Sequence, residues 1–165
     1  MFARYFVDLD MPFGRAEASL LRAPREWLPD IAGAAGSEGD VLLAEVGFGP
    51  PHFRVSKRVA VSVGVPLRLP SKTLLPVTWR AAGVGSLFPE MEGDLEVAPF
   101  GPARSQLSMN ARYHPPLGAV GAAADRALLH RVAEATIRGF VERVREKLEG
   151  LPPAAIAIRG GVVGA

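Results

Sequence analysis

Apolar and polar residues alternate over most of the first two thirds of the chain, and this period of two predicts β-strands with one buried face. The alternation is found in residues 2–9, 53–65, 72–82 and 91–113. The last segment divides into two strands around the Pro-Phe-Gly-Pro run at 99–102, which is dense in turn-forming residues. Because the outward positions of this hairpin are polar or charged, we expect an antiparallel sheet with one face toward solvent.

Two short helices are predicted between the first strand and the rest of the sheet, over residues 12–22 and 24–35. A Gly-Ser-Glu-Gly-Asp run at 36–40 predicts a loop after them. Residues 41–48 then predict a strand that is apolar on both faces apart from Glu45. Such a strand is expected to be covered on both sides for part of its length.

Two prolines lie inside otherwise regular elements. Pro29 falls within the second helix, which it should make irregular because proline lacks the amide hydrogen and clashes with the preceding turn. Pro76 falls within the strand at 72–82. There the missing amide hydrogen predicts an edge strand or a bulge, because a central strand needs that donor.

After the alternating segments the period of apolar positions changes to 3.6, which predicts one amphipathic helix over about 119–149. Its polar face carries Glu134 and Arg138, four residues apart in the favourable order. Gly150 is expected to end it. At ~1.5 Å per residue the helix would be roughly 45 Å long. A helix of that length with one wet face needs an extended partner, and a sheet of about six strands supplies one.

Composition narrows the classes of protein to be considered. At 165 residues, with no cysteine, the chain is predicted to form one domain over 1–150 with a flexible tail at 151–165, without disulfides or thiolate metal sites. Asp8 and Asp10 interrupt any signal-peptide core, and no stretch has the ~18 apolar residues of a membrane helix. We therefore expect a cytoplasmic monomer or homodimer without stable membrane insertion. A net charge of +2 indicates no nucleic-acid partner.

The order of elements predicts an α+β fold, in which a curved antiparallel sheet of roughly six to seven strands surrounds the long helix. A curved sheet does not pack flat on a helix everywhere, so a ligand cavity between them is expected. The alternative is that the inward side chains fill this space at normal density. The residues expected to line the cavity are Val59, Val61, Leu75, Val77, Trp79, Leu95, Val97, Leu107, Met109, Tyr113, Leu129, Ala133, Thr136 and Phe140.

Three segments carry a resemblance to a known family: Gly93-Asp94-Leu95, Pro99 to Gly101, and the run Tyr113-His114-Pro115-Pro116-Leu117-Gly118 before the long helix. They resemble the START-like superfamily (SRPBCC), the polyketide cyclase/dehydrase and lipid-transport group with the helix-grip fold, and more narrowly an actinobacterial branch of it. The resemblance covers about residues 1–150. It implies the fold and the cavity. It implies no mechanism, because that superfamily includes lipid carriers, aromatase/cyclases and chaperone activators and shares no catalytic motif.

The ionisable residues form no recognisable catalytic motif. His52, His114 and His130 are the three histidines, and their spacing matches no zinc-binding pattern, so no metal or other cofactor is expected. His130 and Glu134 lie one helical turn apart, close enough to pair. His114 is either a turn residue or a polar group at the cavity entrance. Lys57 lies on an apolar strand face, where it either meets an anionic ligand group or extends into water.

Trp79 and Tyr113 are either core aromatics or ligand-stacking groups, and Thr136 is a polar group within the apolar stripe of the helix. The leading hypothesis is binding, with transport or sequestration as roles, of a hydrophobic small molecule such as a lipid or polyketide-like compound. Apolar burial at ~25 cal/mol per Å² would drive it. One alternative is a polyketide cyclase or aromatase-type enzyme in which Tyr113, His114 or Arg80 moves protons. Another is a partner-binding module with a filled pocket.

Overall fold

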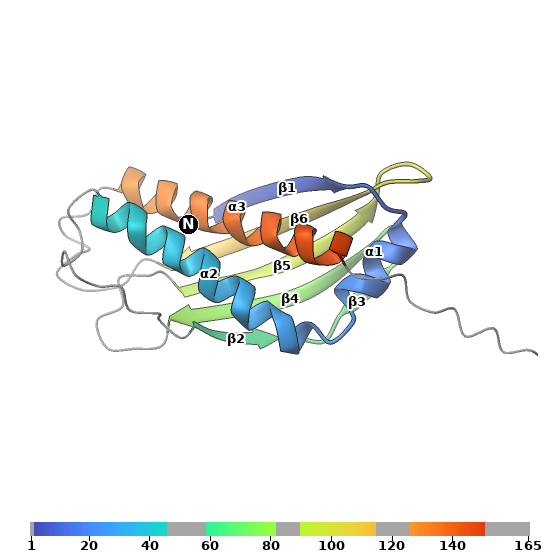
Figure 1. The fold of residues 1–165 in the computed structure, drawn as a ribbon, viewed down its shortest axis with the longest axis horizontal. Helices are drawn as coiled ribbons and strands as arrows, with labels where there is room; N and C mark the ends of the chain where they lie inside the picture. Colours follow the sequence, from blue (N-terminus) through green and yellow to red (C-terminus); the bar gives the residue numbers. More distant parts are fainter. Residues whose placement is uncertain (1, 46–58, 82–89, 115–125, 151–165) are drawn as a thin grey trace, which may run out of the picture.

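The computed structural model describes residues 2–45, 59–81, 90–114 and 126–150 (Figure 1). Strands and helices follow one another in the order expected for an α+β protein. The elements are β1 (Phe2–Leu9), α1 (Phe13–Leu20), α2 (Pro24–Glu45), β2 (Val59–Val63), β3 (Leu67–Leu69), β4 (Lys72–Ala81), β5 (Glu90–Pro99), β6 (Ser105–His114) and α3 (Arg126–Gly150).

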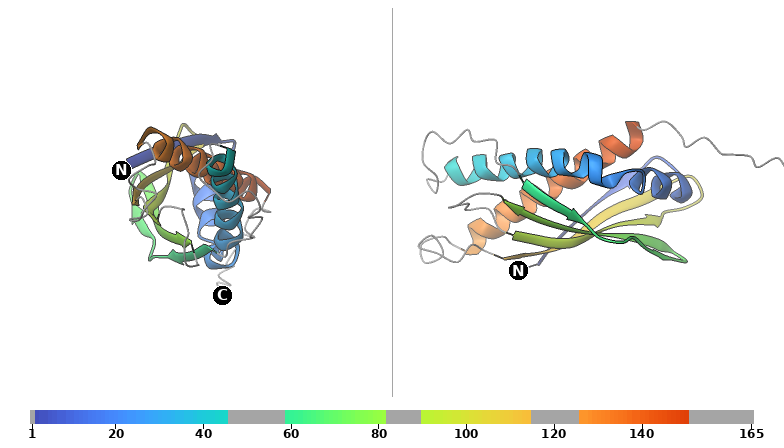
Figure 2. Two further views of the ribbon diagram at one scale, coloured as in Figure 1. Left: turned by 90° about the vertical axis from the view of Figure 1, so that its left-hand side faces the viewer. Right: turned by 90° about the horizontal axis from the view of Figure 1, so that it is seen from below.

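All six strands belong to one antiparallel sheet in the order β1-β6-β5-β4-β2, with β3 also paired to β4. The sheet is curved, and α2 and α3 lie side by side across its concave face (Figures 1 and 2). Helix α3 lies over β1 and β6, whereas α2 lies near β2. This is the helix-grip fold, with two helices between the first two strands and a long helix at the end.

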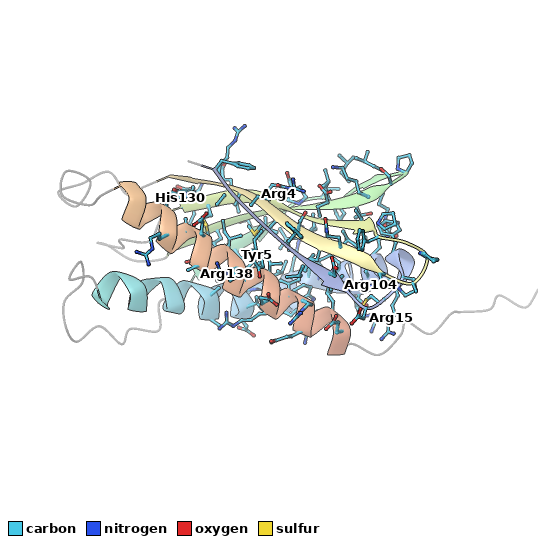
Figure 3. The ribbon with its side chains drawn as sticks, turned by 90° about the horizontal axis from the view of Figure 1, so that it is seen from above. Arg4, Tyr5, Arg15, Arg104, His130 and Arg138 are labelled. Atoms are coloured by element: carbon cyan, nitrogen blue, oxygen red, sulfur yellow. The ribbon has the colours of Figure 1, made fainter. Side chains whose placement is uncertain are left out.

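The interior between sheet and helices has two ends, which we name for what lies there (Figure 3). The His130 end is where α3 begins, and the α1 end is where α3 finishes beside α1. The strand register arranges the inward side chains in rows across the sheet. The row at the His130 end consists of Val61, Trp79, Met91 and Tyr113. The row at the α1 end consists of Val7, Leu107, Val97 and Thr73.

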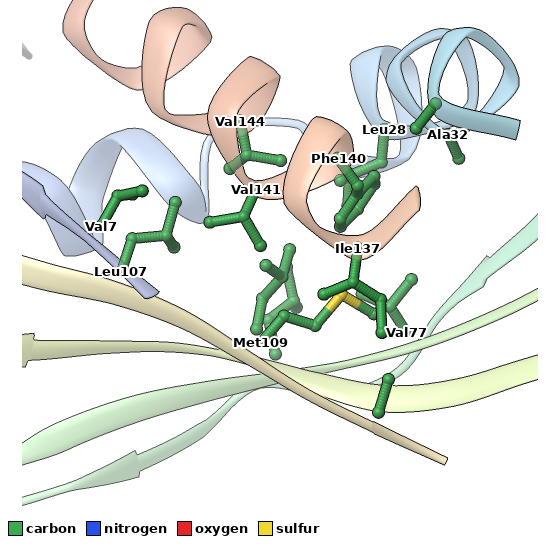
Figure 4. Close-up of a cluster of buried hydrophobic side chains, with 14 of the residues drawn as sticks. Val7, Leu28, Ala32, Val77, Leu107, Met109, Ile137, Phe140, Val141 and Val144 are labelled. Carbon is green, nitrogen blue, oxygen red and sulfur yellow. The ribbon is translucent and has the colours of Figure 1, made fainter. Parts of the chain in front are cut away.

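Two rows of inward side chains lie between them. One carries the larger side chains Tyr5, Met109, Leu95 and Leu75, and the other includes the small residues Gly93 and Ala111. Gly93 pairs with Ala111 on β6 and with Val77 on β4. A Cβ at Gly93 would lie 2.4 Å from the backbone oxygen of Asn110, so only glycine permits this approach of β5 to β6. Ile137 and Phe140 of α3 lie over this part of the sheet (Figure 4).

Helix α2 is longer than the sequence predicts. It continues to Glu45, so the predicted loop at 36–40 is wrong, and residues 41–45 of the predicted strand are helical. Residues 46–48 lie outside the described part of the chain. Glycine and serine each weaken a helix by only about 1 kcal/mol or less. The packing of α2 along α3 outweighs that cost.

The two prolines are accommodated differently from each other. Pro29 lies inside α2 and does not end it. Pro76 pairs with Asp94 in the interior strand β4, so the predicted edge position is wrong. On its other side the partner of β4 changes from β2 to β3, and the amide of Gly64 donates to the Pro76 oxygen at 2.8 Å. The nitrogen of Pro76 faces this same break, where no ladder bond needs a donor.

The bounds of β2 and β3 also differ from the prediction, and some predicted segments are not described. Strand β2 ends at Val63, and Val65 is 83% exposed, so the predicted inward face does not extend that far. Strand β3 was not predicted from the sequence. Residues 53–58, the predicted start of the long helix at 119–125, and the tail at 151–165 lie outside the described residues. Among the described helices, none combines the length and hydropathy needed to span a membrane.

Candidate functional site

The predicted lining residues occupy the inner side of the sheet and helix wherever their side chains are described. Val61 is half-buried, and the side chains of Val59 and Leu129 lie outside the described set. The buried members are Leu75, Val77, Trp79, Leu95, Val97, Leu107, Met109, Tyr113, Ala133, Thr136 and Phe140. Their apolar members belong to one hydrophobic core cluster, which extends from the α1 end to the His130 end of the interior.

Toward the α1 end, aliphatic side chains from the sheet pack directly on α3. Val141 and Val144 of α3 approach Val7 and Leu107 of the sheet (Figure 4). Leu107, Val141 and Val144 are fully buried. This part of the predicted lining is therefore protein core, in which side chains from the two layers contact one another.

The polar groups buried at the α1 end are paired within the protein. The hydroxyl of Thr73 donates to Glu17 Oε1 at 2.6 Å, and Arg68 Nε lies 3.2 Å from the same oxygen. The hydroxyl of Ser105 donates to the backbone oxygen of Met11 at 2.9 Å. Both bonds join the sheet to α1 or to the segment that leads into it, so they serve the fold.

At the His130 end, a buried phenol pairs with a histidine. Tyr113 is fully buried on β6, and its Oη lies 3.0 Å from Nδ1 of His130 on α3. The two rings also stack, with centroids 6.2 Å apart. Nε2 of His130 lies 3.2 Å from Oε1 of Glu134, one turn further along α3. We call these three residues the Tyr113–His130–Glu134 chain.

This chain runs from the interior toward solvent. The side chains of His130 and Glu134 are 43% and 52% exposed, whereas Tyr113 is inaccessible. Burial raises the pKa of Tyr113 above its ordinary value of 10.0, and the charge of Glu134 raises it further. The phenol is therefore protonated at neutral pH and serves as a hydrogen-bonding group, not as an anion.

Aromatic and polar groups surround this chain on the inner side. The ring of Phe140 meets Trp79 edge to face, with centroids 5.3 Å apart. Met91 pairs with both Tyr113 and Trp79 across the sheet. One turn before Phe140, Thr136 is fully buried, and its hydroxyl has no hydrogen-bond partner among the residues that the structure describes. An unsatisfied buried hydroxyl costs about 1–3 kcal/mol, so it needs an explanation.

The other ionisable candidates do not join this site. Arg80 points away from the interior, is largely exposed and pairs with Glu90 on the neighbouring strand. His52 and Lys57 lie outside the described residues, as does the side chain of His114. In the described ranges, no group of three or more histidine, aspartate or glutamate residues has an arrangement that could hold a metal ion.

The outer face of the sheet also carries an open groove of about 400 Å³. It crosses the strands beside Gly93, and its walls include Phe2, Glu92, Asp94 and Arg112. These residues point away from the helices, so this groove is separate from the interior predicted to bind a ligand.

The pairing of Tyr113 with His130 was not found from the sequence. The alternation of β6 places Tyr113 inward, and His130 lies at the border of the apolar stripe of α3. Their contact depends on where along the sheet the helix crosses, and no local pattern encodes that position.

Solved structures with the same architecture provide the comparison. A conserved protein from Geobacillus kaustophilus matches with a TM-score of 0.52 and 13% identity, over 90% of this chain and 95% of that one. An aromatase/cyclase from Streptomyces sp. R1128 matches with a TM-score of 0.45 and 13% identity, over 90% of this chain and 93% of that one. A protein from Thermus thermophilus matches with a TM-score of 0.42 and 13% identity, over 90% of this chain and 97% of that one.

At these identities the likeness shows the fold alone, and the two scores below 0.5 carry no argument about this chain. No protein-family model matches the sequence, and no curated protein matches it either. The helix-grip architecture is therefore established.

Proposed function

We propose that this protein is a START-like (SRPBCC) helix-grip protein that binds a hydrophobic small molecule, such as a lipid or polyketide-like compound, between its sheet and α3. The observation that carries the proposal is the concentration of buried polar groups at the His130 end. Tyr113 and Thr136 bury hydroxyls there among Trp79, Met91 and Phe140. The Tyr113 hydroxyl pairs with His130, whereas the Thr136 hydroxyl has no partner among the described residues, and a ligand with an apolar body and a polar group would supply one.

Apolar burial supplies the affinity in this proposal. Each 100 Å² of ligand surface removed from water contributes about 2.5 kcal/mol before the cost of association is subtracted. Aromatic rings and a methionine suit such a ligand, because their faces and flexible thioether adapt to different shapes. A cytoplasmic location and a monomeric or homodimeric state remain predictions from the sequence.

The two tryptophans allow a direct test. Trp79 lies in the proposed site, whereas Trp27 lies on α2 with its indole nitrogen donating to the Arg22 oxygen at 3.0 Å. A Trp27→Phe variant therefore leaves Trp79 as the single fluorescent reporter. We expect native mass spectrometry of freshly purified protein to show a bound lipid-sized molecule, and we expect apolar ligands to change Trp79 emission.

One combined result would contradict the binding function. Bare protein in the mass spectrum, together with Trp79 emission that no apolar compound alters, would remove the binding function. It would favour a module that binds a protein partner and has a filled pocket. Trp79→Phe with Trp27 retained is the matched control, because its remaining reporter lies on α2 and its emission should not respond to ligand.

A second function, a polyketide cyclase or aromatase-type enzyme, is favoured by the Tyr113–His130–Glu134 chain. A buried phenol linked to a half-exposed imidazole can take a proton from the acidic carbon of a bound poly-β-ketone while its own hydrogen passes to Nδ1 of His130. Tyr113→Phe should then abolish turnover of a poly-β-ketone while leaving its binding largely intact. Full turnover in that variant would exclude Tyr113 as the group that accepts the substrate proton.

A further inference from the structure

We propose that the Tyr113–His130–Glu134 chain makes the His130 end select apolar ligands that carry a hydroxyl group over ligands of the same shape that carry a carbonyl group. The proposal rests on the binding function above and adds the chemical class of the ligand. It follows from the position of each hydrogen along the chain.

The carboxylate of Glu134 determines which ring nitrogen of His130 carries the hydrogen. An ionised carboxylate only accepts hydrogen bonds, so Nε2 of His130, 3.2 Å away, must carry the hydrogen between them. A neutral imidazole has one N–H. Nδ1 of His130 is therefore the acceptor, with its lone pair directed at Tyr113.

The phenol of Tyr113 then has a defined polarity. Its oxygen lies 3.0 Å from Nδ1, and two acceptors would not approach so closely without a hydrogen between them. The phenol must supply that hydrogen, and it has only one. Toward a ligand, the oxygen of Tyr113 then acts as an acceptor.

An acceptor in an apolar enclosure discriminates between ligands. An alcohol donates its hydroxyl hydrogen to Tyr113, whereas a ketone presents a second acceptor and leaves its own oxygen unsatisfied. Two buried oxygens that face each other without a hydrogen between them weaken binding. We therefore expect the Kd of the ketone to be about tenfold higher than that of the alcohol. Thr136 does not create this preference, because its hydroxyl can rotate to donate or to accept.

Menthol, menthone and menthane provide matched probes, because they share one carbon skeleton and differ only in the polar group. The dissociation constants are measured in the Trp27→Phe protein from Trp79 emission, at about pH 8, above the ordinary titration range of imidazole. We expect menthol to bind about tenfold more tightly than menthone. Tyr113→Phe should reduce that ratio to about one.

The substitution His130→Leu tests the role of Nδ1 as the acceptor of the phenol hydrogen most directly. It releases the phenol hydrogen, so menthone should gain affinity and the preference for menthol should disappear or reverse. Thr73→Val, which alters a buried threonine at the α1 end, is the control that keeps the chain, and it should retain the preference. If His130→Leu does not fold, Tyr113→Phe still tests the inference, because it keeps the aromatic ring.

The outcomes separate the two proposals. If none of the three probes binds, this inference is overturned, and the mass spectrum of the purified protein decides the binding function separately. If all three bind with equal affinity, or if Tyr113→Phe keeps the preference for menthol, the hydrophobic site stands and only the inference is overturned.

Discussion

The two ends of the interior bury similar hydroxyl groups in different ways. At the α1 end, Thr73 and Ser105 each donate to a partner within the protein, at 2.6 Å and 2.9 Å. At the His130 end, the buried hydroxyl of Thr136 has no partner among the described residues, and Tyr113 pairs with a half-exposed histidine. Polar groups at the first end join the sheet to α1 or the segment before it, whereas at the second end the Thr136 hydroxyl lacks a described partner and Tyr113 is linked to solvent through His130.

The apolar side chains also differ between the α1 end and the His130 end. Aliphatic residues with few rotamers meet α3 at the α1 end, and they specify one packing arrangement. Aromatic rings and Met91 predominate at the His130 end, where they can adapt to a guest. This difference fits the proposed binding function, in which one end provides stability and the other tolerates an imperfect core.

The largest expected effect comes from shortening a side chain at each end. Leu107→Ala at the α1 end should lower the free energy of unfolding by about 2–5 kcal/mol, because Leu107 is fully buried in a packed aliphatic layer. Met91→Ala at the His130 end should cost less, below about 2 kcal/mol, if the proposed ligand site lies beside it, because a flexible thioether there would have fewer fixed contacts. Urea unfolding of the ligand-free proteins measures both values.

Equal losses in the two variants would show that both ends are packed alike. That outcome would undermine the division of the interior and favour a filled core. An addition of menthane to both proteins extends the test. It should recover stability in Met91→Ala, where the site persists with added space, more than in Leu107→Ala.

Much of the sheet could be predicted from the sequence, because its inner and outer faces have different neighbours. In the hairpin of β5 and β6, Leu95, Val97, Leu107 and Met109 were predicted inward, and all four are buried. Apolar and polar residues alternate over most of this segment because the outer face meets water, although Ser108 on that face is buried. For the same reason, the polar face of α3 allowed most of that helix to be predicted.

The parts that could not be predicted depend on contacts between distant elements. The run at 36–40 has loop composition, yet it continues α2 because α3 provides a surface for the helix to pack on. The contact of Tyr113 with His130 depends on how far along the sheet α3 crosses. Neither residue carries a local signal of the other, so the candidate site became visible only in three dimensions.

A matched substitution at the two ends should give opposite signs. Thr73→Val removes the hydroxyl that donates to Glu17, leaves a carboxylate with one bond fewer, and should lower the free energy of unfolding by about 1–2 kcal/mol. Thr136→Val replaces an unpartnered hydroxyl with a methyl group of similar size and should raise it by about 1 kcal/mol. Both threonines are fully buried, so the comparison isolates the hydrogen bond.

Thermal and urea unfolding of the two valine variants and the parent protein measure these changes in the free energy of unfolding. A loss of stability in both would mean that Thr136 has a partner in the folded protein, and its hydroxyl would no longer indicate a ligand. Thr136→Ser is a useful third protein. It keeps the hydroxyl and loses only a methyl group, so it should not show the gain.

The smallest effect concerns alkaline pH and compares Tyr113 with Tyr5, a partly buried tyrosine on β1. Burial raises the pKa of Tyr113 first, whereas for Tyr5 the hydrogen bond to Glu142 at 2.8 Å is the main cause of a raised pKa. Tyrosines in the unfolded chain ionise near pH 10, before those of the folded protein. Stability should therefore be constant below about pH 10 and fall as the pH rises above it.

Tyr113→Phe should flatten that fall more than Tyr5→Phe, because Tyr113 is wholly inaccessible and Tyr5 is only partly buried. Urea unfolding between about pH 9 and 11 measures the slopes, and an unchanged slope in Tyr113→Phe would mean that water reaches the phenol at the His130 end.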